Sequence, residues 1–246
     1  MQELASVQAA LDRADHEEVL RLTDAILAER PGDDAAHELR ARALLALGRT
    51  DEAQQHAADA VRLDPDEVRY RELMAEVLSA EGAHREAATE YARLARGDPR
   101  QRAWTLAEAG ERLDADEAAR AADAARRAVR LNPSDFDAQL ALARALLRTG
   151  EPGGALRAAA TAAELQPEDA QAREALADAE WLSNRDAAAF AQFRRLAQEL
   201  SGASRDRVVA KARALYAQHA GLGGRIVLAI PGLFEAALER GWLNVR

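Results

Sequence analysis

The chain has 246 residues and a net charge of −9, it lacks cysteine, and aromatic residues make up only 4% of it. The absence of cysteine excludes disulfides and thiolate metal sites, and the acidic balance argues against nucleic acid as a partner. Residues 1–30 lack the pattern of a secretory signal, and no apolar run reaches the length of a membrane span. We therefore expect a cytoplasmic protein. Because the helix formers Ala, Leu, Arg and Glu dominate the composition, we also expect an all-α fold. The alanine- and arginine-rich composition, with Lys211 as the only lysine, is typical of a GC-rich bacterial genome.

Five prolines recur at a constant spacing of thirty-four residues: Pro31, Pro65, Pro99, Pro133 and Pro167. Such a period is typical of stacked supersecondary repeats, each of which buries its apolar face only against its neighbours. Ser201 stands where a sixth proline would fall. The spacing therefore predicts an elongated array with a large exposed surface.

Three other positions keep their residue type at the same spacing. One is a turn position, which holds Ala14, Gly48, Gly82, Asp116, Gly150 and Asn184. The other two hold small residues. The first of these holds Val7, Ala41, Ala75, Ala109, Ala143 and Ala177, and the second holds Val19, Ala53, Ala87, Ala121, Ala155 and Ala189. Gly, Asp and Asn tolerate the left-handed backbone that ends a helix, and small side chains let two helices approach closely. Each unit is therefore predicted to be two helices joined by a short turn, as at residues 34–47 and 51–63.

On these positions the chain resembles the tetratricopeptide repeat (TPR) family, whose unit is a helix pair of 34 residues. Tyr91 and Phe193 also match an aromatic position of that family. The resemblance covers residues 1–203 as six units, the first and last degenerate: 1–33, 34–67, 68–101, 102–135, 136–169 and 170–203. It implies a right-handed superhelical solenoid of antiparallel helix pairs, followed by a C-terminal helical cap or tail at 204–246.

The chain departs from the family pattern in two ways. The usual tryptophan position holds polar residues instead: His37, Arg71, Thr105, Gln139 and Arg173. In the fourth unit, Arg112 replaces a leucine and Trp104 is one position out of register. We therefore expect no aromatic plug in the repeats, and either a local distortion or a bend in the fourth unit.

Because the first helix of each pair lines a concave groove in TPR proteins, the resemblance implies a set of candidate partner-binding residues. They form a leucine ridge ending in a tryptophan, with charges of both signs beside it: Glu38, Arg42, Leu45, Glu72, Glu76, Leu106, Leu113, Leu140, Arg144, Leu147, Asp178 and Trp181. This pattern suits an extended peptide or an amphipathic helix of a partner protein. The same leucines equally suit packing between neighbouring helices. The Lys and Asn residues with which chaperone-binding members hold a C-terminal carboxylate are absent from the corresponding positions.

The sequence predicts neither catalysis nor a bound cofactor or metal. Its five histidines lack metal-ligand spacing, and Gly221–Gly224 is interpreted as a helix stop because no strand precedes it. We therefore expect a non-catalytic adaptor or scaffold. A self-assembling structural protein and a regulatory accessory subunit of an enzyme or envelope complex remain as alternatives.

Beyond residue 203 the period fails. Residues 204–220 are predicted to form one more amphipathic helix, and a short helix is predicted to end near Arg240. The run 226–230 is compatible with a helix or a strand. The segment either caps the solenoid or docks into a groove of its own chain or a neighbour's, and Glu235 and Glu239 argue against contact with anionic membranes.

Overall fold

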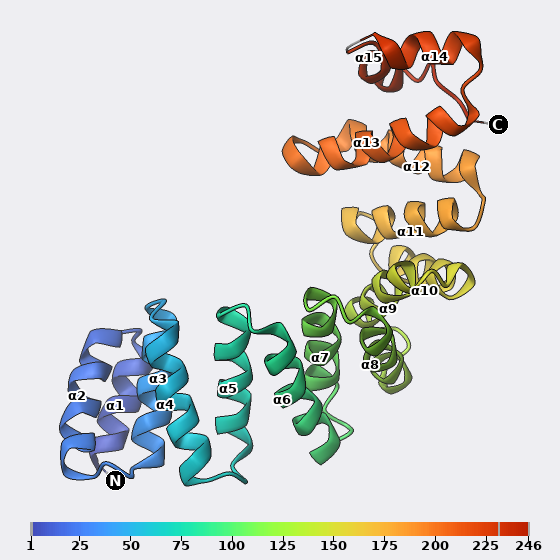
Figure 1. The fold of residues 1–246 in the computed structure, drawn as a ribbon. Coiled ribbons are helices and arrows are strands. Elements are labelled where there is room, and N and C mark those ends of the chain that lie inside the picture. Colours follow the sequence, from blue (N-terminus) through green and yellow to red (C-terminus); the bar gives the residue numbers. More distant parts are fainter. Residues whose placement is uncertain (1, 231, 246) are drawn as a thin grey trace. The chain divides into compact units, whose positions relative to one another are not determined.

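The computed structural model describes residues 2–230 and 232–245, and within these ranges every regular element is a helix (Figure 1). The helices are α1 (Gln2–Asp12), α2 (His16–Glu29), α3 (Asp34–Ala46), α4 (Thr50–Leu63), α5 (Val68–Ala80), α6 (His84–Gly97), α7 (Arg102–Asp114), α8 (Ala118–Leu131), α9 (Phe136–Thr149), α10 (Pro152–Leu165), α11 (Ala170–Leu182), α12 (Asp186–Glu199), α13 (Gly202–His219), α14 (Leu222–Ala229) and α15 (Leu233–Glu239). The all-α prediction is confirmed. None of the described helices combines the length and apolar character that crossing a bilayer requires.

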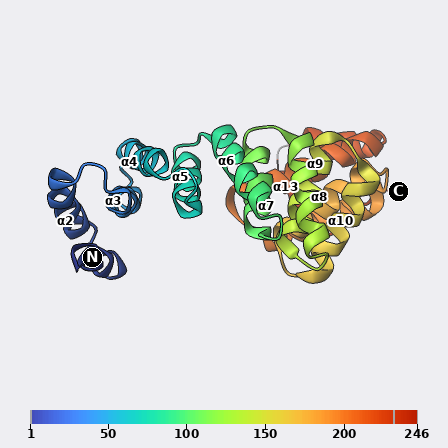
Figure 2. The ribbon, with the colours of Figure 1, turned by 90° about the horizontal axis from the view of Figure 1, so that it is seen from below.

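The chain divides into two compact units, residues 1–117 and 118–246, which we describe separately as unit 1 and unit 2. In unit 1 each helix packs against the next, and α1 and α5 also contact α3. Figure 2 shows α3, α4 and α5 side by side. Unit 2 repeats this arrangement from α8 to α13, and α9 also contacts α11. The boundary falls inside the fourth predicted repeat, whose two helices have 13 and 14 residues like their neighbours.

The predicted turn position adopts the left-handed backbone in all six repeats. The φ angles are 72°, 77° and 73° at the glycines and 57°, 59° and 58° at Ala14, Asp116 and Asn184. Glycine adopts this conformation freely and Asn and Asp tolerate it, whereas an alanine is strained there. The turn prediction is therefore confirmed, with Ala14 as its strained member.

The small residues hold the paired helices together. All the residues at the two predicted small positions are completely buried, from Val7 and Val19 to Ala177 and Ala189. A larger side chain at such a position would have to displace the facing helix, because protein interiors are closely packed. Close packing of the paired helices therefore explains why alanine recurs at a fixed spacing in the sequence.

The loops that carry the prolines use two polar contacts. The second helices end two residues before each proline, and Asp33, Asp135 and Asp169 cap the next helix by accepting hydrogen bonds from backbone N–H groups three residues on. In the second, third and fifth repeats, the side chain at the usual tryptophan position, six residues after the proline, contacts the proline carbonyl. His37 Nε2 lies 3.0 Å from the Pro31 oxygen, and Gln139 Nε2 donates to the Pro133 oxygen at 2.7 Å. In these repeats a polar link replaces the aromatic plug.

The C-terminal segment belongs to the core of unit 2. Phe234, Leu238, Leu243 and Val245 are buried in the same hydrophobic cluster as Phe193, which lies on α12. Residues 226–229 lie in α14, so the strand alternative for this run is wrong; helical backbone hydrogen bonding continues there, as the bond from the Ile230 N–H to the Ile226 oxygen shows. The predicted helix stop falls at residues 220–221, before the start of α14.

Candidate functional site

One surface depression in unit 2, of about 550 Å³, collects three of the twelve predicted groove residues: Leu147, Asp178 and Trp181. Leu147 lies on α9, and the other two lie on α11 three residues apart, hence on one face of that helix. The remaining lining residues come from these helices, the turn after α11 and α13: Arg148, Leu182, Asn184, Lys211 and Gln218. We call this surface the unit 2 depression. Its walls are both apolar and charged.

Trp181 is held in a fixed orientation at the depression. Its indole packs edge-on against the fully buried Phe193, with ring centroids 6.2 Å apart and an interplanar angle of 83°. Its Nε1 donates a hydrogen bond to Gln218 Oε1 on α13 at 3.4 Å. The side chain is half-buried, so part of the indole remains accessible. A large aromatic side chain that is already immobilised can contact a ligand at little further entropic cost.

A group of four charged residues connects α11 to α13 beside this tryptophan. Arg207 donates two hydrogen bonds to the Glu174 carboxylate, at 2.9 and 2.8 Å, and Lys211 Nζ lies 2.8 Å from Glu174 and 2.5 Å from Asp178. Burial opposes ionisation of Glu174, but the hydrogen bonds from Arg207 and Lys211 outweigh it and lower its pKa to about 2. Burial dominates at Asp178 and raises its pKa, although Lys211 and, more weakly, Arg207 oppose the shift. Lys211 therefore serves mainly as a partner of these carboxylates.

Three of the four charged candidates of unit 1 pair with neighbouring side chains. Glu38 is buried and pairs with Arg42 on its own helix at 2.7 Å and with Arg69 on α5 at 3.6 Å. Glu72 accepts a hydrogen bond from Trp104 Nε1 at 2.9 Å. The displaced tryptophan of the fourth repeat thus has a defined role, linking α7 to α5.

Two further groups of unit 1 titrate abnormally because they are half-buried. Burial raises the pKa of Glu76, although Arg42 partly opposes the shift. Burial, with the charges of Glu76, Glu111 and Glu72, raises the pKa of Tyr91 to about 12. Burial at this part of the unit 1 surface therefore disfavours the charged forms of both groups.

The remaining candidates differ in how much surface they offer. Leu113 and Leu140 are only 7% and 6% exposed, so they pack within the cores of unit 1 and unit 2. Leu45 and Leu106 are half-buried, and Arg144 is exposed and donates a hydrogen bond to Gln171 at 2.6 Å. The leucine ridge thus contains buried packing residues as well as accessible ones.

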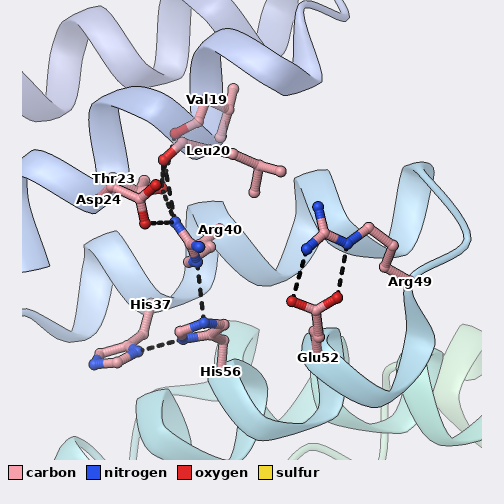
Figure 3. A network of polar contacts seen from close by, with 9 residues as sticks. All are labelled: Val19, Leu20, Thr23, Asp24, His37, Arg40, Arg49, Glu52 and His56. Carbon is pink, nitrogen blue, oxygen red and sulfur yellow. Dashed lines mark hydrogen bonds and ion pairs between the residues drawn. The ribbon is translucent and has the colours of Figure 1, made fainter.

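A polar cluster in unit 1 was not predicted from the sequence. His37 Nδ1 and His56 Nδ1 lie 2.9 Å apart, and Arg40 Nε donates to His56 Nε2 at 3.0 Å (Figure 3). The two histidines are nineteen residues apart, the same separation as Arg71 and Glu90, which form an ion pair at 3.4 Å in the next repeat. A search of the sequence for pairs of polar residues nineteen residues apart would have found the cluster. A search for short metal-binding motifs does not find it, because the two histidines are far apart in the sequence.

Comparison with protein families gives two matches, both to models described as tetratricopeptide repeat. One covers residues 10–77, and the other covers residues 106–159 and 140–204. No curated protein matches the chain.

Several solved structures share the fold. A tetratricopeptide repeat protein from Parabacteroides merdae is 14% identical, with a TM-score of 0.69 over 98% of each chain. The C-terminal part of a TPR repeat-containing protein from Cytophaga hutchinsonii is 14% identical, with a TM-score of 0.72 over 95% of this chain and 92% of that one. YrrB, described as a TPR protein with an unusual peptide-binding site, is 17% identical, with a TM-score of 0.60 over 71% of this chain and 90% of its own. At these identities the likeness concerns the fold alone.

Proposed function

The chain belongs to the tetratricopeptide repeat family, and we propose that it is a non-catalytic scaffold that binds a peptide or an amphipathic helix of a partner protein at the unit 2 depression. The repeat fold supports a protein-interaction scaffold in general, because a stack of helix pairs exposes an extended surface. YrrB, which shares the fold, is described as having a peptide-binding site, and this supports a peptide as the class of ligand.

The observation that carries the proposal is the immobilised Trp181 beside Leu147 and Leu182 at an open depression. Tryptophans are enriched among the residues that dominate binding energy at protein interfaces. Lys211 and Asp178 largely satisfy one another, so we expect an apolar anchor side chain of the ligand to contribute most of the affinity. Charges around the rim would then select the orientation of the ligand.

Selection of binding peptides from a displayed random library, using the full chain, tests the proposal. The affinities of the selected peptides are then measured by fluorescence polarisation for the wild type, for Trp181→Ala and for Leu147→Asp. The control is Trp242→Ala, because Trp242 is 65% exposed and does not line the depression. We expect both depression variants to weaken binding roughly thirtyfold or more, and the control to bind like the wild type. Wild-type affinity in a folded Trp181→Ala variant would refute the proposal.

Self-association is a second candidate function, favoured by exposed apolar residues in the C-terminal segment. Ile226, Ile230 and Trp242 are 57%, 46% and 65% exposed. Light scattering over a range of protein concentrations tests this candidate, with the triple serine variant of these residues as the comparison. A mass that rises with concentration in the wild type but not in the variant supports self-association, and a constant monomer mass in both eliminates it. Point variants are preferable to deleting 225–246, since Phe234 and Leu238 belong to the core.

A further inference from the structure

We infer that His37, His56 and Asp59 form a binding site for a divalent transition-metal ion, with Zn²⁺ as the ion of best-matched chemistry. The three side chains lie on α3 and α4 of unit 1, and their ligand atoms all lie within 4.8 Å of one another. Two imidazoles and a carboxylate are a common set of protein ligands for zinc, with water completing the coordination. His37 is buried while His56 and Asp59 are half-buried, which leaves a solvent-facing side for such water.

The spacing of the ligand atoms is close to what a tetrahedral ion requires. Metal–ligand bonds of about 2.0–2.1 Å place neighbouring tetrahedral ligands about 3.3 Å apart. His37 Nδ1 lies 2.9 Å from His56 Nδ1 and 3.9 Å from Asp59 Oδ2, so these separations bracket that value. His56 and Asp59 are three residues apart on one face of α4, and small side-chain rotations bring both into place.

The contacts outside the ligand set orient two of the ligands. A carbonyl oxygen can only accept a hydrogen bond, so the contact of His37 Nε2 with the Pro31 oxygen at 3.0 Å assigns the ring proton to Nε2. The lone pair of His37 Nδ1 then faces His56 and Asp59. Asp59 Oδ1 accepts a hydrogen bond from Arg62 at 2.9 Å, while Oδ2 lies toward His37. Such outer contacts are typical of metal-binding histidines and carboxylates.

The fold itself does not require this pair of imidazoles. In the third repeat, Arg71 occupies the position equivalent to His37, donates to the Pro65 oxygen at 2.9 Å and pairs with Glu90. In the fifth repeat Gln139 makes the proline contact. Arginine and glutamine therefore make the loop contact as histidine does, and the facing position need not be histidine. The second imidazole in the second repeat links His37 to Arg40, and it adds a potential metal ligand that the loop itself does not require.

Arg40 opposes metal binding, and this gives the proposal a distinctive test. Without metal, His56 Nδ1–H donates to His37 Nδ1, and His56 Nε2 accepts from Arg40 Nε at 3.0 Å. A metal at His56 Nδ1 moves the ring proton to Nε2, where it meets the Arg40 donor. Arg40 Nη1 also contacts the Leu20 oxygen, Thr23 and Asp24, at 3.1, 3.2 and 2.6 Å, so the guanidinium retains partners on α2 when it releases His56 (Figure 3). Removing Arg40 should therefore tighten binding.

Calorimetric titration of the untagged full chain with Zn²⁺, paired with Co²⁺ absorption spectroscopy, tests the site. We expect one ion per chain, at least a tenfold loss of affinity in His56→Gln and in Asp59→Asn, and a severalfold gain in Arg40→Gln. The matched control is His219→Gln, because His219 contacts Asp186 at 2.7 Å but belongs to no group of three potential ligands among the residues that the structure describes. It should bind like the wild type, and the Co²⁺ absorption band should be lost in His56→Gln.

Two results would overturn the proposal that these residues bind a metal ion. The first is the absence of saturable one-to-one binding in the wild type at millimolar Zn²⁺. The second is wild-type affinity in a His56→Gln variant whose circular dichroism shows that it is folded. Asp59→Asn removes a half-buried ligand without changing side-chain size, so it provides the same test if His56→Gln fails to fold.

Discussion

The same repeat position is used differently in unit 1 and unit 2. Glu38 and Glu174 are equivalent by the thirty-four-residue period, and both are nearly buried. Glu38 pairs with Arg42 of its own helix and, at 3.6 Å, with Arg69 of the following first helix. Glu174 instead receives Arg207 and Lys211 from α13, which lies outside the period. The role of a repeat position therefore depends on the helix that follows it, and the C-terminal helix gives unit 2 its distinct site.

The largest expected effect is the loss of stability when each of these two glutamates is replaced by glutamine. Glu174→Gln should lower the free energy of unfolding by roughly 1–3 kcal/mol, because it leaves Arg207 and Lys211 beside a neutral amide. Glu38→Gln should cost less, since its pair with Arg69 is long at 3.6 Å, whereas Glu174 has two partners within 2.9 Å. Urea unfolding followed by circular dichroism measures both. An equal or larger loss in Glu38→Gln would contradict the comparison.

A second expected difference concerns the pH dependence of stability. The folded pKa of Glu174, about 2, lies below its ordinary value of 4.5. The carboxylate therefore stabilises the fold above about pH 4.5, and this contribution is lost as the pH falls through 4.5 toward 2. The stability difference between the wild type and Glu174→Gln should shrink over that window. A difference that stays constant from pH 6 to pH 3 would show that the ion pairs contribute little.

The smallest expected effect compares the strained turns of the two units. Ala14 in unit 1 and Asn184 in unit 2 have φ angles of 57° and 58°. Ala14→Gly should stabilise the protein by about 1 kcal/mol, because alanine is strained in the left-handed region. Asn184→Gly should gain less, since asparagine tolerates this conformation. Thermal unfolding of both variants measures the difference, and a larger gain at Asn184 would contradict this reading of the turns.

Much of the fold was predictable because it repeats. The left-handed turns and the buried small residues follow from columns that recur in six units, so Gly48 or Ala53 could be interpreted from its equivalents. The resemblance to TPR proteins, read along the same period, pointed to Leu147, Asp178 and Trp181, which the structure brings to one depression.

What the sequence did not predict involves residues outside the period or pairs that occur once. Arg207 and Lys211 lie beyond residue 203, where no equivalent position indicates their direction. His37 and His56 meet across two helices at a separation of nineteen residues, which has no short motif. The five-residue run from Ile226 was too short for periodicity to distinguish helix from strand.

The central claim is that a partner peptide contacts Trp181, and tryptophan fluorescence measures this most directly. A Trp104→Phe, Trp242→Phe variant retains Trp181 as its one tryptophan. We predict that a peptide selected on the full chain shifts the emission of this variant saturably, with the same dissociation constant that polarisation gives. Binding by polarisation with unchanged Trp181 emission would contradict the claim.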